Sequence, residues 1–406
     1  MFKRSSDSVL NQPSYTNYWV SRILSNTCFQ MLSVAIGWQM YALTHSAFSL
    51  GFVGLAQFLP MVVLTLVVGH VADRFDRRVI TLLCLIVEAM IAACLFAETF
   101  VGALERFQIL LFAAGLGACR AFEGPASSAL LPQIVRQDLV QQAVAWTTSG
   151  GQAAQILGPS LGGVLYSLGP NYVYSTVTVA LVVASILNGF IRVEKTIRVH
   201  KRVSMQSLFE GLVFVYRHKV ILGTISLDLF AVLLGGATAL LPIFAQDILH
   251  TGAWGLGLMR SAPAVGALLM SIVFAYYPLK KAVGMTLFGA LAVFGLATML
   301  FAVSTHLVVS LIALFLVGAS DVVSVVIRSS LVQLQTPDEM RGRVNAVNSL
   351  FIGTSNQLGE FESGMVAGFI GAVPAALIGG FGTLVVAGIW MYLFPSIRRI
   401  RSLSEA

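Results

Sequence analysis

"GHVADRFDRRVI", residues 69–80, places five charged side chains between two long apolar runs. The charges are Asp73, Arg74, Asp76, Arg77 and Arg78. Of the 406 residues 57% are hydrophobic and only 11% are charged, whereas a soluble domain is about 25% charged. So few charges cannot cover a surface that faces water. We therefore expect most of the chain to lie in a membrane, with this stretch as a connection outside it.

Apolar runs of about twenty residues recur along the chain, which is the length that crosses a bilayer as a helix. Strands of a membrane barrel would be shorter and would alternate apolar with polar residues. The twelve runs are 18–43, 49–72, 79–98, 106–131, 142–167, 172–192, 221–246, 254–278, 282–303, 307–332, 344–370 and 373–395. The sequence therefore predicts an all-α integral membrane protein with twelve transmembrane helices.

The positive charges are distributed unevenly between the two sides of the predicted membrane. Of 25 Lys and Arg residues, 20 lie at the termini or in alternate connections, and only Arg106 lies on the opposite side. Cytoplasmic loops carry such an excess of basic residues, so both termini are predicted to be cytoplasmic. The net charge of +7 is thus explained by membrane orientation, and we expect no nucleic-acid partner.

The longest polar connection, 193–219, separates six predicted spans from six. We expect an N-terminal bundle at 1–192 and a C-terminal bundle at 220–406. Apolar residues within the connection recur at helical spacing beside a basic flank, which predicts an amphipathic helix on the inner membrane surface. They are Met205, Leu208, Phe209, Leu212, Val213 and Tyr216. A plain linker is the alternative.

The two halves resemble each other weakly. An offset of 201 aligns residues 117–163 with 318–364 without a gap and gives eight identities, and an offset of 206 aligns 47–51 with 253–257. The identities include Gly158 with Gly359 and Gly163 with Gly364. Two parallel repeats with a binding site between them are an architecture of membrane transporters.

The opening stretch resembles the loop 2–3 signature of the major facilitator superfamily, Gly-x-x-x-Asp-Arg-x-x-Arg-Arg. The matching residues are Gly69, Asp73, Arg74, Arg77 and Arg78. Asp76 stands where the signature has glycine. The resemblance implies the major facilitator fold, with this loop as a latch that holds the cytoplasmic side between conformations. A solvated loop that only orients two helices is the alternative.

A second stretch, "GPSLGG" at 158–163, resembles the last part of the superfamily's antiporter signature in helix 5. The matching residues are Gly158, Pro159, Gly162 and Gly163. Alanines replace the upstream glycines, and ordinary tight helix packing is the alternative. Residues 119–135, 235–249, 333–347 and 358–364 are similar to the bacterial branch that contains the enterobactin exporter and related drug and macrolide efflux proteins. This resemblance implies export across a bacterial inner membrane.

Ionisable side chains inside the predicted spans are functional candidates, because a charge at the bilayer centre costs about 2.5–3.5 kcal/mol. In the repeat alignment, Arg22 occupies the position equivalent to Asp228, and Arg120 the position equivalent to Asp321. We hypothesise that an arginine-bearing N-terminal half faces an acidic C-terminal half across a polar cavity, with Arg328 as a further partner. Local neutralisation within each half is the alternative.

A proton-coupled transporter needs a carboxyl group that changes its protonation, and a moving arginine partner can cause that change. We expect Asp228 or Asp321 in this role, because each is isolated on its own helix. Glu123, which can pair with Arg120 one turn away, and Glu360 come next. Glu362 points to another face, and Glu88 is predicted to be structural.

Together these features predict a secondary active transporter that exports a siderophore or an amphipathic drug-like solute by proton antiport and alternating access. Uptake of a small nutrient is the alternative within transport, and a transport-inactive membrane sensor or assembly partner is the alternative outside it. No nucleotide-binding loop or metal-ligand cluster is evident, so we expect no enzyme activity, cofactor or metal. The expected partners are the small-molecule substrate, protons and membrane lipid, and the expected functional unit is a monomer.

Overall fold

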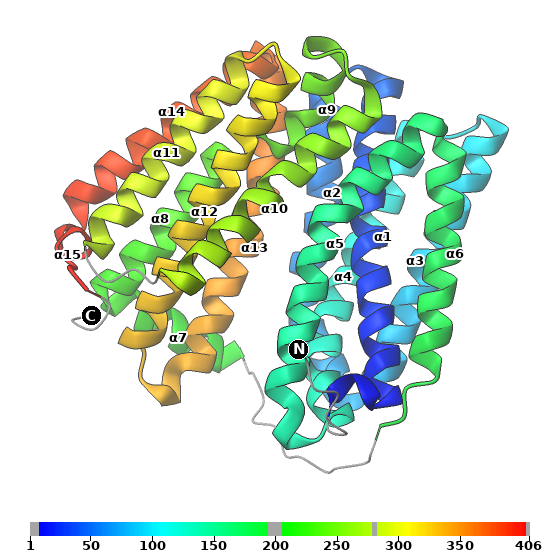
Figure 1. Ribbon diagram of the computed structural model, residues 1–406, viewed down its shortest axis with the longest axis horizontal. Helices are drawn as coiled ribbons and strands as arrows, with labels where there is room; N and C mark the ends of the chain where they lie inside the picture. The colour runs from blue at the N-terminus through cyan, green and yellow to red at the C-terminus, as the bar shows by residue number, and fades with distance from the viewer. Residues whose placement is uncertain (1–7, 194–204, 278–281, 403–406) are drawn as a thin grey trace. The chain divides into compact units, whose positions relative to one another are not determined.

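The computed structural model describes residues 8–193, 205–277 and 282–402, and these ranges contain helices and no strand (Figure 1). The helices of the first half are α1 (Pro13–Thr44), α2 (Ala47–Arg74), α3 (Arg77–Val101), α4 (Arg106–Ile134), α5 (Val140–Leu168) and α6 (Pro170–Gly189). Those that follow are α7 (Met205–Arg217), α8 (Lys219–Gly235), α9 (Leu241–Ile243), α10 (Gly252–Tyr276), α11 (Val283–Val303), α12 (Leu307–Gln335), α13 (Asp338–Ile370), α14 (Ala372–Leu393) and α15 (Pro395–Arg398). Short 3-10 or π segments lie at Val9–Asn11, Gln137–Leu139, Ala237–Leu240 and Phe244–Ile248.

Nine helical segments within these described ranges are long and apolar enough to cross a membrane. The long helices α1, α5 and α13 are not among the nine, although they have 32, 29 and 33 residues. The prediction of an all-α membrane protein is confirmed, and the number twelve stays a prediction. Helix α7 lies inside the connection that the sequence singled out, whereas residues 194–204 of that connection lie outside the described part.

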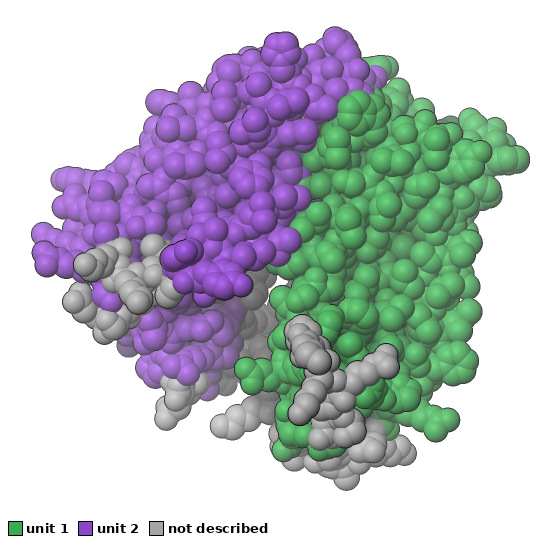
Figure 2. All heavy atoms as spheres, in the orientation of Figure 1, with its two compact units in different colours: residues 1–45, 56–200, 252–261 green, residues 46–55, 201–251, 262–406 purple. Residues whose placement is uncertain are grey.

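The chain forms two compact units, which Figure 2 colours separately. Unit 1 comprises residues 1–45, 56–200 and 252–261, and unit 2 comprises 46–55, 201–251 and 262–406. In unit 1, α1 packs against α4, α5 and α6, and α3 packs against α4 and α6. In unit 2, α11 packs against α12 and α14, and α8 packs against α13 and α14. The start of α2 thus belongs to unit 2, and the start of α10 belongs to unit 1. The division into bundles at 1–192 and 220–406 stays a prediction.

The charged connection between α2 and α3 ends at a helix cap. Asp76 is the N-cap of α3, and its carboxylate accepts a hydrogen bond of 2.9 Å from the backbone N–H of Arg78. Aspartate is among the best N-cap residues because it satisfies a backbone donor that has no partner within the helix. The residue that departs from the family signature therefore stabilises the start of α3.

One pair of repeat positions forms a close helix crossing in each unit. In unit 1, a Cβ added to Gly163 of α5 would lie 2.9 Å from the Cα of Gly257 in α10. In unit 2, a Cβ added to Gly364 of α13 would lie 2.5 Å from the Cα of Gly51 in α2. The offsets of 201 and 206 pair Gly163 with Gly364 and Gly51 with Gly257. The two crossings therefore support the internal repeat that the sequence showed only weakly.

Helices α10 and α12 of unit 2 also touch backbone to backbone. A Cβ on Gly318 would lie 1.9 Å from the carbonyl oxygen of Pro263, and a Cβ on Gly266 would lie 2.1 Å from that of Phe315. Gly289 of α11, in contrast, has no neighbouring atom within 4 Å of an added Cβ. Small residues allow membrane helices to approach closely and gain packing contacts.

We predict that Gly318→Val destabilises the protein by about 1–3 kcal/mol or more, because the added side chain must separate the two backbones. Thermal unfolding of the purified protein in detergent should show a lower Tm. The matched variant Gly289→Ala should leave the Tm unchanged or raise it. Equal Tm values for the two variants would show that the α10–α12 contact does not depend on glycine.

Candidate functional site

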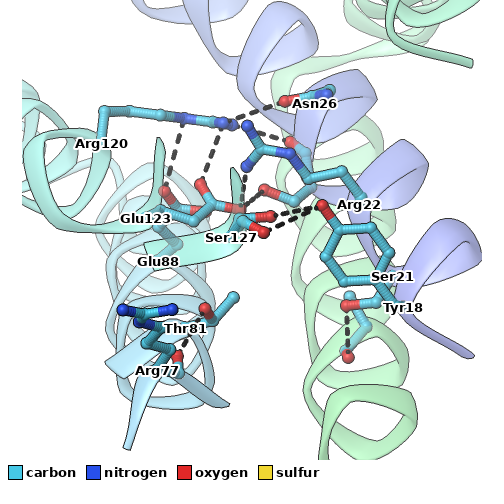
Figure 3. A network of polar contacts seen from close by, with 12 residues as sticks. Tyr18, Ser21, Arg22, Asn26, Arg77, Thr81, Glu88, Arg120, Glu123 and Ser127 are labelled. Atoms are coloured by element: carbon cyan, nitrogen blue, oxygen red, sulfur yellow. Dashed lines mark hydrogen bonds and ion pairs between the residues drawn. The ribbon is translucent and has the colours of Figure 1, made fainter. Parts of the chain in front are cut away.

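Four charged side chains meet inside unit 1, and Figure 3 shows them between α1, α3 and α4. Arg22 Nη1 lies 3.0 Å from Glu123 Oε1, and Arg120 Nη1 lies 3.0 Å from Glu123 Oε2. Arg120 Nε lies 3.6 Å from Glu88 Oε1. Both glutamates are buried, with 1% of their surface exposed. We call these four residues the unit 1 charge cluster; it carries two positive and two negative charges and is formally neutral.

Helical spacing explains how α1 and α4 supply this cluster. Arg120 and Glu123 are three residues apart on α4 and therefore share a face. One turn beyond Arg22 on α1, Ser25 donates a hydrogen bond of 2.7 Å from its hydroxyl to Glu123. Arg120 donates to the backbone oxygen of Ser25 at 2.9 Å and to the amide oxygen of Asn26 at 3.1 Å. Buried ions need such additional hydrogen bonds, since attraction alone does not offset their desolvation.

Glu88 is the member of the cluster whose partner the sequence does not indicate. Helix α3 packs on α4 and brings Glu88 to Arg120. That Glu88 has a structural role stays a prediction. The available signal was the charge itself, because Glu88 is an isolated acid in a strongly apolar run and such an acid requires a partner. The sequence could not name the partner because α3 and α4 meet only in the folded bundle.

Three charged side chains form a second cluster inside unit 2, which we call the unit 2 charge cluster: Asp228 of α8, and Asp321 and Arg328 of α12. Arg328 forms an ion pair with Asp228 and donates a hydrogen bond of 3.1 Å from Nε to the hydroxyl of Ser324. Within the part of the chain that the structure describes, Asp321 makes neither a hydrogen bond nor an ion pair. The cluster has two carboxylates and one guanidinium, so its formal charge is −1 when both acids are ionised.

Both aspartates of the unit 2 charge cluster line one small pocket. Its walls come from α8, α11 and α12. The lining residues are Asp228, Ala231, Val232, Leu291, Phe294, Ser320, Asp321 and Ser324. No group of three or more His, Cys, Asp or Glu side chains among the described residues is placed to hold a metal ion.

Five intramembrane charges form ion pairs within their own units. Arg22 and Arg120 pair with Glu123, and Asp228 pairs with Arg328. Local neutralisation, the alternative that the sequence left open, therefore accounts for these five charges. The opposition of an arginine-bearing half and an acidic half across a cavity stays a prediction.

The signature arginines of the first connection bind helix carbonyl groups in unit 1. Arg77 donates a hydrogen bond of 2.9 Å to the backbone oxygen of Ala129 in α4, and Arg78 donates to the backbone oxygen of Gly189, the last residue of α6. A cation is favoured at a helix C-terminus, where carbonyl groups lack helical partners. The side chains of Asp73 and Arg74 and the surroundings of Gly69 lie outside the described part, so the latch stays a prediction.

The "GPSLGG" stretch of α5 packs closely against two other helices. A Cβ on Gly158 would lie 2.6 Å from the Cβ of Gln30 in α1, and one on Gly162 would lie 2.8 Å from the Cα of Met31. Gly163 meets α10, as described above, while Pro159 lies buried between these contacts. The stretch is a packing surface, and its role in antiport stays a prediction.

Two further carboxylates lie on α13 and are not among the residues that line the pocket. An added Cβ on Gly54 would be 3.2 Å from the Cβ of Glu360, so Glu360 lies against the start of α2. Glu362 accepts a hydrogen bond of 3.4 Å from Ser363. Neither is a member of the unit 2 charge cluster.

Comparison with known proteins gives one family over nearly the whole chain. The model of a family described as transmembrane secretion effector matches residues 4–404. An enterobactin exporter, EntS, of Citrobacter koseri is 25% identical over 399 residues, covering 96% of this chain and 94% of its own length. EntS of Salmonella typhimurium is 24% identical over 401 residues with the same coverage.

Solved structures of membrane transporters share the fold. The nucleoside transporter NupG superposes with a TM-score of 0.73 at 14% identity, covering 94% of this chain and all of its own. A bacterial homologue of the lysosomal transporter Spinster, in an inward-facing conformation, has a TM-score of 0.72 at 13% identity and covers 95% of each chain. At such identities the likeness concerns the fold alone.

We predict that Glu123→Gln destabilises the protein by about 3–5 kcal/mol, because it leaves the partly buried Arg22 without a carboxylate and Arg120 with Glu88 alone. Glu88→Gln should cost less, since Glu88 touches only Arg120 and at a longer distance. Thermal unfolding in detergent compares the two variants directly. A larger loss of Tm in Glu88→Gln would show that the cluster is not centred on Glu123.

Proposed function

This chain belongs to the major facilitator superfamily, within the family of transmembrane secretion effectors, and on that premise we propose that it is a proton-coupled exporter of the bacterial inner membrane. The proposed cargo is an amphipathic organic solute, either a siderophore or a drug-like compound. Export is supported by the relatives, which are named enterobactin exporters and align over nearly their whole length. The motif in α5 that resembles the antiporter signature supports the same direction.

The observation that carries proton coupling is the unequal charge balance of the two clusters. In the unit 1 charge cluster two arginines match two glutamates, so protonating either glutamate would leave a partly buried arginine charge unmatched. In the unit 2 charge cluster Arg328 is engaged by Asp228, and Asp321 is the second carboxylate. A proton on Asp321 makes that cluster neutral. Among the four candidate carboxylates, we therefore assign the proton to Asp321.

Movement of Arg328 relative to the two aspartates would couple the proton to the conformational cycle. Burial favours the neutral form of a carboxyl group, and a nearby guanidinium favours the ionised form. Asp321 and Arg328 are seven residues apart on α12, whereas Asp228 is on α8. A shift of α8 against α12 would separate Asp228 from Arg328. The charges near Asp321 would then change, and with them its tendency to hold a proton.

The cargo can be identified by comparing the secreted metabolites of a deletion strain and its parent by mass spectrometry, in iron-replete and iron-starved growth. With that compound, we predict that Asp321→Asn loses transport driven by a pH gradient in proteoliposomes but keeps exchange of cargo down its own gradient. The reason is that asparagine cannot change its charge. Asp138→Asn, an exposed change outside both clusters, should behave as the parent does. Uphill, pH-driven transport by Asp321→Asn would refute the assignment.

The loop signature gives a separate prediction. Asp73→Asn removes one negative charge from the proposed latch and leaves every arginine that orients the helices. We expect normal insertion and at least a tenfold loss of transport rate, measured in the same proteoliposomes with protein content matched by quantitative immunoblot. Transport at the parental rate would show that the loop only orients α2 and α3.

A further inference from the structure

The last described residues of the chain form a basic surface on unit 2. Helix α15, which follows α14 directly, packs against α8, α11 and α14 (Figure 1). Three arginines lie at the end of α15 and just after it: Arg398, Arg399 and Arg401. All three are exposed. We call these residues the C-terminal arginine cluster.

The backbone that carries the cluster is fixed to the core of unit 2. Ile397 is fully buried in that core, and Ile400 packs against it. The N–H of Gly284 donates a hydrogen bond of 3.0 Å to the carbonyl oxygen of Ile400, and the N–H of Val283 donates one of 3.4 Å to that of Arg401. These oxygens satisfy donors in the first turn of α11, which have no partner within the helix. The isoleucines therefore face the core, and the arginines beside them face outward.

The cluster has a positive charge that acidic side chains do not balance. Among the residues that the structure describes, none forms an ion pair with the three guanidinium groups, whereas the exposed Arg136 is paired with Asp138 at 2.8 Å. Residues 363–404 contain no aspartate or glutamate. Glu405, which lies outside the described part, could neutralise at most one of the three arginines. At least two positive charges are thus available to an external anion.

An exposed apolar surface lies next to the cluster. Helix α14 is apolar enough to cross a membrane, so its last residues lie near the surface of the bilayer. Two of these residues, Tyr392 and Leu393, are 85% and 58% exposed, and Met285 in the first turn of α11 is 52% exposed. Tyrosine is enriched where the headgroups of a membrane meet its apolar interior. An anion bound at the arginines can therefore carry an apolar chain.

We propose that the C-terminal arginine cluster binds the headgroup of an anionic phospholipid, whose acyl chains lie against the apolar side chains at the ends of α14 and α11. Guanidinium groups suit the phosphodiester because their planar fork can donate two parallel hydrogen bonds to it. Basic residues immediately beside a transmembrane helix attract anionic lipids. The proposal is independent of the cargo and of the direction of transport.

Two simpler roles for the cluster differ from this one in what they require. A site for a free phosphate compound has no use for the exposed apolar side chains beside it. Arginines that only orient α14 during insertion act before the protein is folded, so they require neither a fixed backbone nor a particular headgroup afterwards. Lipid selectivity of the folded protein therefore distinguishes the proposed role from both.

Native mass spectrometry of the full-length protein in detergent tests the selectivity. Phosphatidylglycerol and phosphatidylcholine with the same acyl chains would be titrated separately, because both contain the phosphodiester but only phosphatidylglycerol has a net charge. We expect phosphatidylglycerol to bind at least tenfold more tightly. A hundredfold excess of glycerophosphoglycerol, the same headgroup without acyl chains, should not displace it. Equal binding of the two lipids would overturn the proposal, and displacement by the free headgroup would show a site for a soluble phosphodiester instead.

Combined substitutions connect the binding to the cluster. With Arg398→Gln, Arg399→Gln and Arg401→Gln together, the affinity for phosphatidylglycerol should fall at least tenfold. The same three positions changed to lysine should keep it within threefold, since the charge remains. Arg136→Gln removes an exposed arginine that a carboxylate already neutralises, and it should change nothing. Equal affinities in the triple glutamine variant and the parent would overturn the proposal, as would an equal loss in Arg136→Gln.

Two measurements remain decisive even if the triple glutamine variant folds poorly. In the unmutated protein, the preference for phosphatidylglycerol should shrink as the salt concentration is raised, because salt screens exposed charges. Its Tm should also be higher in nanodiscs of phosphatidylglycerol than in nanodiscs of phosphatidylcholine, because a ligand of the folded state stabilises it. The triple lysine variant should keep this difference in Tm. A preference that salt leaves unchanged, or equal Tm values in the two lipids, would overturn the proposal.

Discussion

A charge inside a bilayer has no water to solvate it, and the arrangement of this protein's intramembrane residues follows from that constraint. Apart from Arg120 with Glu123, which both lie on α4, the described ion pairs of the spans join different helices, such as α1 with α4 and α8 with α12. The pairs fix which faces of these helices meet, because a helix rotated away from its partner would leave a charge without compensation. Polar pairing and small-residue packing thus determine the helix arrangement together, since apolar side chains alone cannot distinguish a neighbouring helix from lipid.

The two units satisfy the constraint differently. Unit 1 has a neutral cluster whose members form ion pairs with one another and a hydrogen bond to the backbone of α1. Such an arrangement is typical of a structural element. In unit 2 the single arginine neutralises one of two carboxylates, and the other, Asp321, lines a pocket. A chemical event that adds or removes one positive charge, such as protonation, fits the second cluster and disturbs the first. Function is therefore expected where pairing is incomplete.

Composition and the length of the apolar runs were sufficient to predict a helical membrane protein, and the loop motif was sufficient to indicate the superfamily. Pairing was harder to predict. The contact of Arg120 with Glu123 follows from their spacing on α4, but those of Arg22 with Glu123, Glu88 with Arg120 and Asp228 with Arg328 join different helices, whose rotation about their axes no periodicity specifies. Asp76 gives the opposite lesson: it departs from the motif, and it serves as a helix cap.

The reciprocal glycine contacts have a consequence for how the chain can be assembled. Each crossing joins a residue encoded before the 193–219 connection to one encoded after it: Gly163 meets Gly257, and Gly51 meets Gly364. A half-length chain would hold one member of both contacts and complete neither. During synthesis, α2 and α5 therefore enter the membrane with their glycine surfaces uncovered, and those surfaces remain exposed to lipid until α10 and α13 have been made.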